Sequence, residues 1–169
     1  DYLVGKRDRA KFHPHETFDY GTHEVGQVVE QVIKGNINFM IGVCSPNVLI
    51  SSIWHADLLE IIQNQPCKNI FHSIHGLGLA NHKKYIESGK DTSTKRVSKI
   101  LRVVDFGIHY LETGKMEFKP SNREPIPSNV DIALGELEVA YRSSELPEYP
   151  SVDPYHEWLC DLRKEVMGI

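Results

Sequence analysis

The chain has 169 residues, of which 40% are hydrophobic and 25% are charged, and its formal net charge at pH 7 is −4. This length and apolar content are enough for one buried core. No run of about 18 apolar residues is present, which excludes a membrane-spanning helix, and the first residues lack the pattern of an export signal. We therefore expect a globular, cytoplasmic protein with no membrane partner.

The first predicted elements are two short strands, DYLVG at residues 1–5 and FDYGT at 18–22. A helix is predicted over 23–35, HEVGQVVEQVIKG, because its valines and isoleucine recur at helical spacing. Thr22 is a suitable N-cap for it, and the Gly35-Asn36 pair supplies a stop. The next segment, NFMIGVCSPNVLISS at 38–52, is continuously apolar around a proline, so its periodicity does not distinguish a buried helix from a buried strand.

The remainder of the chain is predicted to be helical, and a proline-rich loop, KPSNREPIPSN, interrupts it. Asp153 and Pro154 are a suitable cap and first-turn residue for the last helix. The cysteines lack metal-ligand spacing and are predicted to be reduced, mostly buried thiols: Cys44, Cys67 and Cys160. The predicted helices span residues 53–64, 67–88, 92–114, 129–144 and 154–167.

Positive charge is concentrated in the middle of the chain. Between His82 and Arg102 there are seven lysines and arginines against two acids, whereas the segment from Asp131 to Ile169 carries nine acids and three bases. A basic stretch of this kind is either a solvated surface or a binding site for an anion. Few aromatic residues lie among these bases, which argues against recognition of single-stranded nucleic acid by base stacking.

The predicted helix at 92–114 separates its apolar residues from its cations. Lys95, Lys99 and Arg102 recur at i, i+4 and i+7, opposite a broad apolar face. Such a row suits the oxygens of a phosphate chain, because arginine engages two oxygens at once and lysine supplies a point charge. An ordinary surface helix presents the same pattern, so the two interpretations stay open at this stage.

Two kinds of residue pattern could bind a metal ion: pairs of histidines and a pair of carboxylates on one strand. The histidine pairs His72/His75 and His13/His15 each lack a third ligand, so we do not expect them to bind one. Two carboxylates at i and i+2 on one strand face the same side, about 6.5–7 Å apart, and with a third they can hold Mg²⁺ against a nucleoside triphosphate. Asp1 is either the second member of such a pair or only a chain terminus.

Several segments between Glu24 and about Pro147 resemble a family of predicted nucleotidyltransferases within the DNA-polymerase-beta-like superfamily, which includes archaeal and phage-borne members. They are HEVGQVVEQVIKGNINFM with CSP, then HGLGLANHKK, TSTKRVSKILRVVDFGIHYLETGKMEF and GELEVAYRSSELPE. Family members begin with a Gly-Ser turn and an Asp-x-Asp strand. DYLVG is similar to the end of that strand, and the resemblance makes Asp1 its second aspartate.

The resemblance also implies roles for other residues, and it has gaps. Glu24 aligns with the third carboxylate of the family, where aspartate is more usual, although an acid in the first turn of a helix is also favoured by the helix dipole. Lys95 and Arg102 align with basic positions. The Gly-Ser turn and the first aspartate are not among these 169 residues, and the segment SNREPIPSN departs from the usual helix there, which leaves only a weak interest in Arg123.

We therefore expect an α/β (α+β) fold, predominantly helical, with a small sheet of the nucleotidyltransferase type. Residues 1–52 are the remainder of the α/β core, and 53–169 are a helical C-terminal part. The resemblance implies transfer of a nucleoside monophosphate from an NTP such as ATP to an unknown acceptor, with nucleic acid as one candidate. Asp1 and Glu24 are the expected catalytic ligands of Mg²⁺, and Lys95, Lys99 and Arg102 are expected to hold phosphates. The alternative is a catalytically inactive helical module that binds a nucleotide or RNA.

Overall fold

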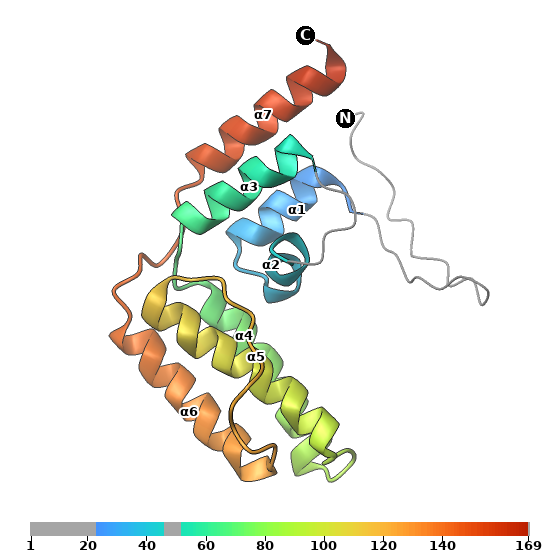
Figure 1. The fold of residues 1–169 in the computed structure, drawn as a ribbon, viewed down its shortest axis with the longest axis vertical. Coiled ribbons are helices and arrows are strands. Elements are labelled where there is room, and N and C mark those ends of the chain that lie inside the picture. The colour runs from blue at the N-terminus through green and yellow to red at the C-terminus, as the bar shows by residue number, and fades with distance from the viewer. Residues whose placement is uncertain (1–22, 46–51, 169) are drawn as a thin grey trace, which may run out of the picture.

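The structure is a computed structural model, and it describes residues 23–45 and 52–168. Every regular element in these ranges is a helix (Figure 1). In chain order they are α1 (Val25–Ile33), α2 (Ile37–Val43), α3 (Ile53–Asn64), α4 (Ile70–Asn81), the π-helical segment η1 (His82–Glu87), α5 (Thr94–Thr113), α6 (Pro127–Ser143) and α7 (Asp153–Met167). None of these helices is long and apolar enough to cross a membrane.

The predominantly helical fold confirms the coarser half of the predicted fold class. No strand occurs in the described ranges, so the small sheet is not found there. The segments that the structure describes have helical spacing of their apolar residues, and both predicted strands, 1–5 and 18–22, lie outside them together with Thr22. The division at residue 52 stays a prediction, because much of the first predicted part is not described.

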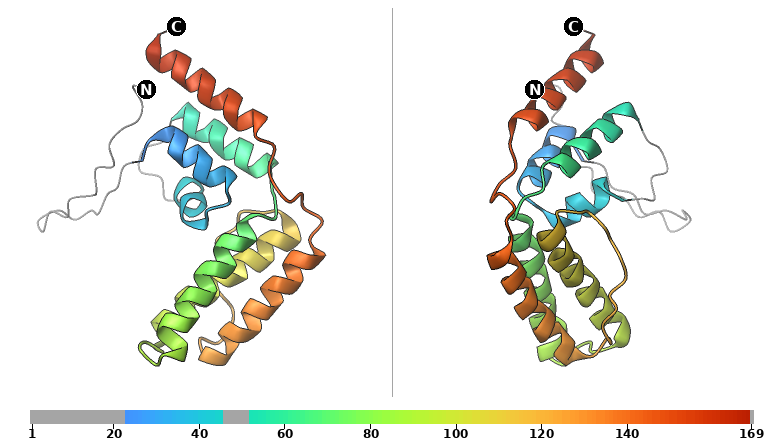
Figure 2. Two further views of the ribbon diagram at one scale, coloured as in Figure 1. Left: turned by 180° about the vertical axis from the view of Figure 1, so that it is seen from behind. Right: turned by 60° about the vertical axis from the view of Figure 1, so that its left-hand side comes forward.

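The helices form two groups that meet near the middle of the molecule (Figure 1). In one group α4, α5 and α6 pack into a bundle: α4 runs antiparallel to α5, and the segment between α5 and α6 returns along α5 before α6 begins (Figures 1 and 2). The fully buried side chains of this bundle include Ile74, Leu101, Val104, Tyr110 and Leu137. Gly107 of α5 lies where a methyl group would meet Ile74 and Leu137 at 2.9 Å, so helix approach is close here.

The second group contains α1, α2, α3 and α7. α7 packs on α3, where the two indole rings of Trp54 and Trp158 meet edge to face, and Trp158 Nε1 donates a hydrogen bond to the Trp54 carbonyl oxygen (3.1 Å). Tyr155 is buried beneath the same helix. Leu159 and Leu162 are partly buried, and Val166, which its helical spacing also predicts to be buried, is exposed. The helix begins at Asp153 itself, and its cap residue, Val152, makes no side-chain capping bond.

The corner between α1 and α2 fixes α2 against the bundle. α1 ends in a left-handed Gly35 (φ 69°), whose N–H donates to the Val32 carbonyl oxygen, as the predicted stop requires. Asn69, at the start of α4, donates its Nδ2 to the Ile33 carbonyl oxygen (2.7 Å). The Ile37 N–H, at the start of α2, donates to Ser73 Oγ of α4 (3.0 Å). Both groups of helices are thus joined through α4.

Candidate anion-binding site

Helix α5 is amphipathic in the way its sequence predicts. Its Ser93 cap accepts a hydrogen bond from the Arg96 N–H, and Gly114 ends it in the left-handed conformation. The apolar side of the helix is buried at Val97, Ile100, Leu101, Val104 and Leu111, with Ile108 partly buried. Lys95, Lys99 and Arg102 are all exposed on the other side. The separation of core and cations is therefore confirmed.

Arg96 of α5 is partly buried, and its positive charge is paired with Asp91. Arg96 Nε donates to Asp91 Oδ2 (2.9 Å), and the guanidinium carbon lies 3.9 Å from the ring centroid of Tyr85. Lys84 lies over the same ring at 5.1 Å. Asp91 and Tyr85 thus anchor the start of α5 to η1.

We expect Asp91 to titrate far below its ordinary range. Hydrogen bonds from Ser93 and then Arg96 lower the pKa of Asp91 from 3.8 to about 2. Because the folded pKa is the lower one, this contribution to stability is complete above 3.8 and is lost as the pH falls through about 2. An NMR titration of the carboxyl carbon should show a midpoint near 2, and Ser93→Ala should raise it. A midpoint of 3.8 in the unaltered protein would contradict these contacts.

A hollow of about 400 Å³ opens beside the exposed face of α5. Lys99 and Arg102 line it from α5, and Ser45 lines it from the residues that follow α2. Its other walls are apolar and come from three segments: Ile41, Val103, Phe106 and Phe118. Phe106 and Phe118 are stacked, with ring centroids 4.2 Å apart, which fixes the return segment on α5. The hollow thus combines an apolar wall with two cations.

The charge at this hollow is not balanced by the described residues around it. No acidic residue is among the described residues that line it. Lys99 and Arg102 make no ion pair or hydrogen bond to any other residue that the structure describes, in contrast to Arg96. Two adjacent uncompensated cations repel each other and raise the local concentration of anions. An anionic ligand with an apolar part matches this arrangement.

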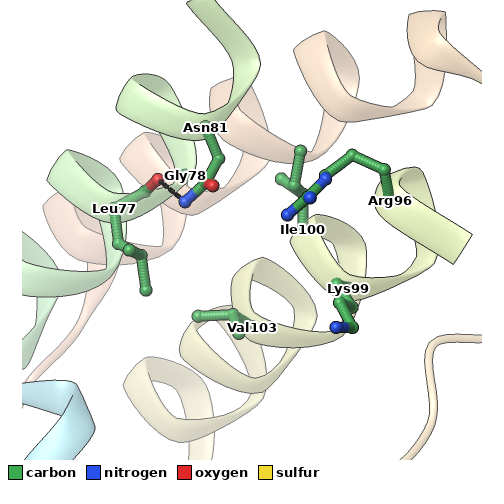
Figure 3. Close-up of a pocket in the computed structure, with 7 residues that line it drawn as sticks. All are labelled: Leu77, Gly78, Asn81, Arg96, Lys99, Ile100 and Val103. Atoms are coloured by element: carbon green, nitrogen blue, oxygen red, sulfur yellow. Dashed lines mark hydrogen bonds between the residues drawn. The ribbon is translucent and has the colours of Figure 1, made fainter. Parts of the chain in front are cut away.

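A second, smaller hollow of about 190 Å³ lies between α4 and α5 and shares Lys99 and Val103 with the first (Figure 3). Asn81 lines it from the end of α4, and Arg96 reaches over it from α5. Leu77, Gly78 and Ile100 complete its walls. Among the described residues, Lys99 is therefore the cation that lines both hollows.

The structure separates the three cations that the sequence grouped together. Lys99 and Arg102 line the same hollow, whereas Lys95, one turn earlier, lines neither hollow. Ser45, Asn81 and Phe118 were not predicted as site residues. A single helix face carries no signal for them, because they come from segments that only the tertiary fold brings to α5.

Glu24 lies at the start of α1, where it, and not the predicted Thr22, serves as the N-cap. Its Oε2 accepts a hydrogen bond from the Gln27 N–H (2.7 Å), and its Oε1 lies 3.7 Å from Arg163 Nη2 of α7. Glu24 Oε1 and Arg163 Nε are buried without a hydrogen-bond partner. Glu24 thus stabilises the start of the helix as its N-cap, one position before the first turn in which the sequence placed it. Its role as a metal ligand stays a prediction.

The described residues do not by themselves fit a magnesium centre. No group of three or more potential ligands comes together in this part of the chain, and Asp1 lies outside it. Magnesium binds several oxygen ligands with near-octahedral geometry. A single carboxylate facing an arginine does not supply them, so we derive no catalytic step through the metal.

Other residues singled out by the sequence have structural partners. Arg123 binds Asp105 through Nε (2.7 Å) and Glu136 through Nη2, which joins the return segment to α5 and α6. His75 stacks on Phe71 with ring centroids 5.2 Å apart, and His72 meets the same ring edge-on. These contacts account for the arginine and for this histidine pair, while His13 and His15 lie outside the described residues.

Comparison with known proteins gives one relative of undefined function. No protein-family model matches the chain. An uncharacterized protein of the archaeon Methanocaldococcus jannaschii is 35% identical to it over 102 residues, which are 60% of this chain and 40% of that protein. The chain therefore spans less than half the length of this curated relative. No solved structure matches.

Proposed function

We propose that the chain is part of a nucleotidyltransferase that binds the triphosphate of an NTP at Lys99 and Arg102. The observation that carries the proposal is the 400 Å³ hollow with two uncompensated cations and no described acidic lining residue. The resemblance of the α5 segment to nucleotidyltransferases adds the reaction class. The expected small sheet, the Mg²⁺ ligands Asp1 and Glu24 and the cytoplasmic location are further parts of this proposal.

The chemistry available to the described residues is charge neutralisation and positioning. Arginine binds two phosphate oxygens in a fixed plane, and lysine adds a point charge beside it. In phosphoryl-group transfer these two effects provide most of the rate enhancement, because the protein does little covalent work. Lys99 and Arg102 would hold the triphosphate in line for an acceptor hydroxyl or phosphate, and pyrophosphate would leave.

The test is release of pyrophosphate from each of the four NTPs in the presence of Mg²⁺, with Glu24→Gln and Arg163→Ala as a matched pair. Both changes remove the ion pair between α1 and α7. If Glu24 has a catalytic role, Glu24→Gln should lower the rate about 100-fold, the range seen for loss of one electrostatic group, while Arg163→Ala should leave it nearly unchanged.

Three other outcomes are informative. Equal effects of the two changes would leave Glu24 as a structural cap only. Binding of NTP without pyrophosphate release would contradict the enzyme and favour the inactive binding module. Failure to bind any NTP or tripolyphosphate would remove the proposed phosphate site itself.

A further inference from the structure

The smaller hollow, which we name the slot, combines apolar walls with polar side chains. Leu77, Ile100 and Val103 supply apolar walls, and Asn81 and Arg96 are polar residues beside them (Figure 3). At about 190 Å³ it is smaller than the roughly 300–1,000 Å³ of pockets that enclose whole drug-sized ligands. It shares Lys99 and Val103 with the larger hollow, so a ligand that fills the slot lies next to the side chains that also line the space beside Arg102.

The amide of Asn81 is fixed in one orientation. Its Nδ2 donates to the Leu77 carbonyl oxygen (2.8 Å), and a carbonyl oxygen only accepts, so Nδ2 cannot exchange places with Oδ1. Asn81 Oδ1 accepts no hydrogen bond from any residue that the structure describes. The side chain therefore presents one free acceptor and one remaining N–H donor at the slot.

This donor and acceptor pair matches one purine and not the other. The N6 amino group of adenine donates and its N7 accepts, and asparagine is the side chain that pairs with this edge in a bidentate manner. The corresponding edge of guanine carries two acceptors, N7 and O6, so one of them would face Asn81 Oδ1. Two acceptors facing each other leave both groups without a hydrogen bond, which is costly in a desolvated slot.

We infer that the small hollow is an adenine site, in which Asn81 reads the base while Lys99 and Arg102 hold the phosphates of the same nucleotide. The inference rests on the proposed function and adds ATP as the preferred substrate. The positions along α5 are consistent with one continuous ligand. Arg96 and Arg102 are six residues apart on the helix, about 9 Å by its rise of 1.5 Å per residue.

The experiment is isothermal titration of the chain with ATP, GTP and inorganic tripolyphosphate at one fixed salt concentration. The unaltered protein should bind ATP about tenfold more tightly than GTP, since one bidentate base contact discriminates by that order. Asn81→Leu should reduce this ratio to about one, and the affinity for tripolyphosphate should not change. Asn64→Leu, at the end of α3 and away from both hollows, is the matched control.

The outcomes separate this inference from the proposed function. Binding of tripolyphosphate with equal affinities for ATP and GTP would overturn the adenine site and leave the phosphate site standing. A preference for ATP that survives Asn81→Leu would also overturn it, because another residue would then read the base. Absence of binding by all three probes would overturn both.

Discussion

Gly35→Ala is expected to lower the free energy of unfolding by about 2–5 kcal/mol. The residue has φ 69°, where a side chain costs about 1–2 kcal/mol, and this cost is independent of the surrounding space. An added Cβ would also lie 2.6 Å from Asn69 Oδ1 and 2.8 Å from the backbone nitrogen of Ile70, so α1 and α4 would have to move apart. Overpacking of this kind costs about 1–3 kcal/mol more. Urea unfolding followed by circular dichroism measures the difference.

Gly89→Ala is the matched control for this change. Gly89 has nearly the same backbone angle, φ 66°, but an added Cβ there meets no atom within 4 Å. Gly89→Ala should therefore lower the free energy of unfolding by roughly 1–2 kcal/mol, the cost of a side chain in the left-handed conformation. If the two variants lost equal stability, close contact between Gly35 and α4 would not be a determinant of the fold.

The corner at Gly35 matters for the site because it places α2. The chain turns there from α1 into α2, and Ile41 of α2 and Ser45 just after it form one wall of the larger hollow. Asn69 and Ser73 of α4 hold this corner through the Ile33 carbonyl oxygen and the Ile37 N–H. The position of the wall relative to Lys99 and Arg102 therefore depends on packing between residues far apart in the sequence.

Helical periodicity was sufficient to predict most of this fold. The bounds of α3 match the predicted 53–64, and the ends of α5, α6 and α7 lie within two residues of their predicted positions. These helices have long apolar stripes, so burial of one face determines their extent. The undecided segment at 38–52 begins as the short helix α2, whose Asn36 cap accepts a hydrogen bond from the Asn38 N–H. Gly78 also packs closely, against Leu134 and Val104, whereas a Cβ added at Gly76 would meet nothing within 4 Å.

Features that depend on tertiary contacts could not be predicted in this way. The predicted helix at 67–88 is one continuous α-helix, but the structure begins it at Ile70 and changes to a π-helix at His82. The imidazole of His82 is nearly buried, with Nδ1 3.3 Å from Glu87 Oε1 and Nε2 3.3 Å from Asp131 Oδ1 of α6. One of these partners lies almost fifty residues away, so the local sequence contains no signal for the contact.

In the candidate site, too, helical spacing predicted some features and tertiary contacts determined the others. The three cations of α5 were found from helical spacing alone, yet that spacing could not show that Arg96 is neutralised by Asp91 or that Lys95 lies away from the hollow. Phe118 lines the hollow from the segment that follows α5, and it was not among the predicted site residues. The sequence thus identified the cationic face of α5, and the fold determined that Lys99 and Arg102, but not Lys95, line one hollow.

Arg102→Ala is expected to weaken tripolyphosphate binding by about 10- to 100-fold, because a hydrogen-bonded charge contributes roughly 1.5–3 kcal/mol. Lys99→Ala should weaken it by about tenfold, since lysine supplies a point charge without the second hydrogen bond. Lys95→Ala is the matched control: it removes an equal charge from the same helix face, outside the lining of the hollow. Isothermal titration at low salt measures all three, and an equal loss for Lys95→Ala would contradict a confined site.

The salt dependence of the same three variants decides between a nucleotide pocket and a face that follows a nucleic-acid backbone. When a protein neutralises several phosphates of a strand, the logarithm of its affinity falls linearly with the logarithm of the salt concentration, and the slope reports how many phosphates are contacted. A backbone-binding face would include Lys95, so Lys95→Ala would reduce the slope for single-stranded RNA as much as Arg102→Ala does. A pocket confined to Lys99 and Arg102 requires the opposite: the slope for RNA should be insensitive to Lys95, and tripolyphosphate should compete fully with the bound nucleotide.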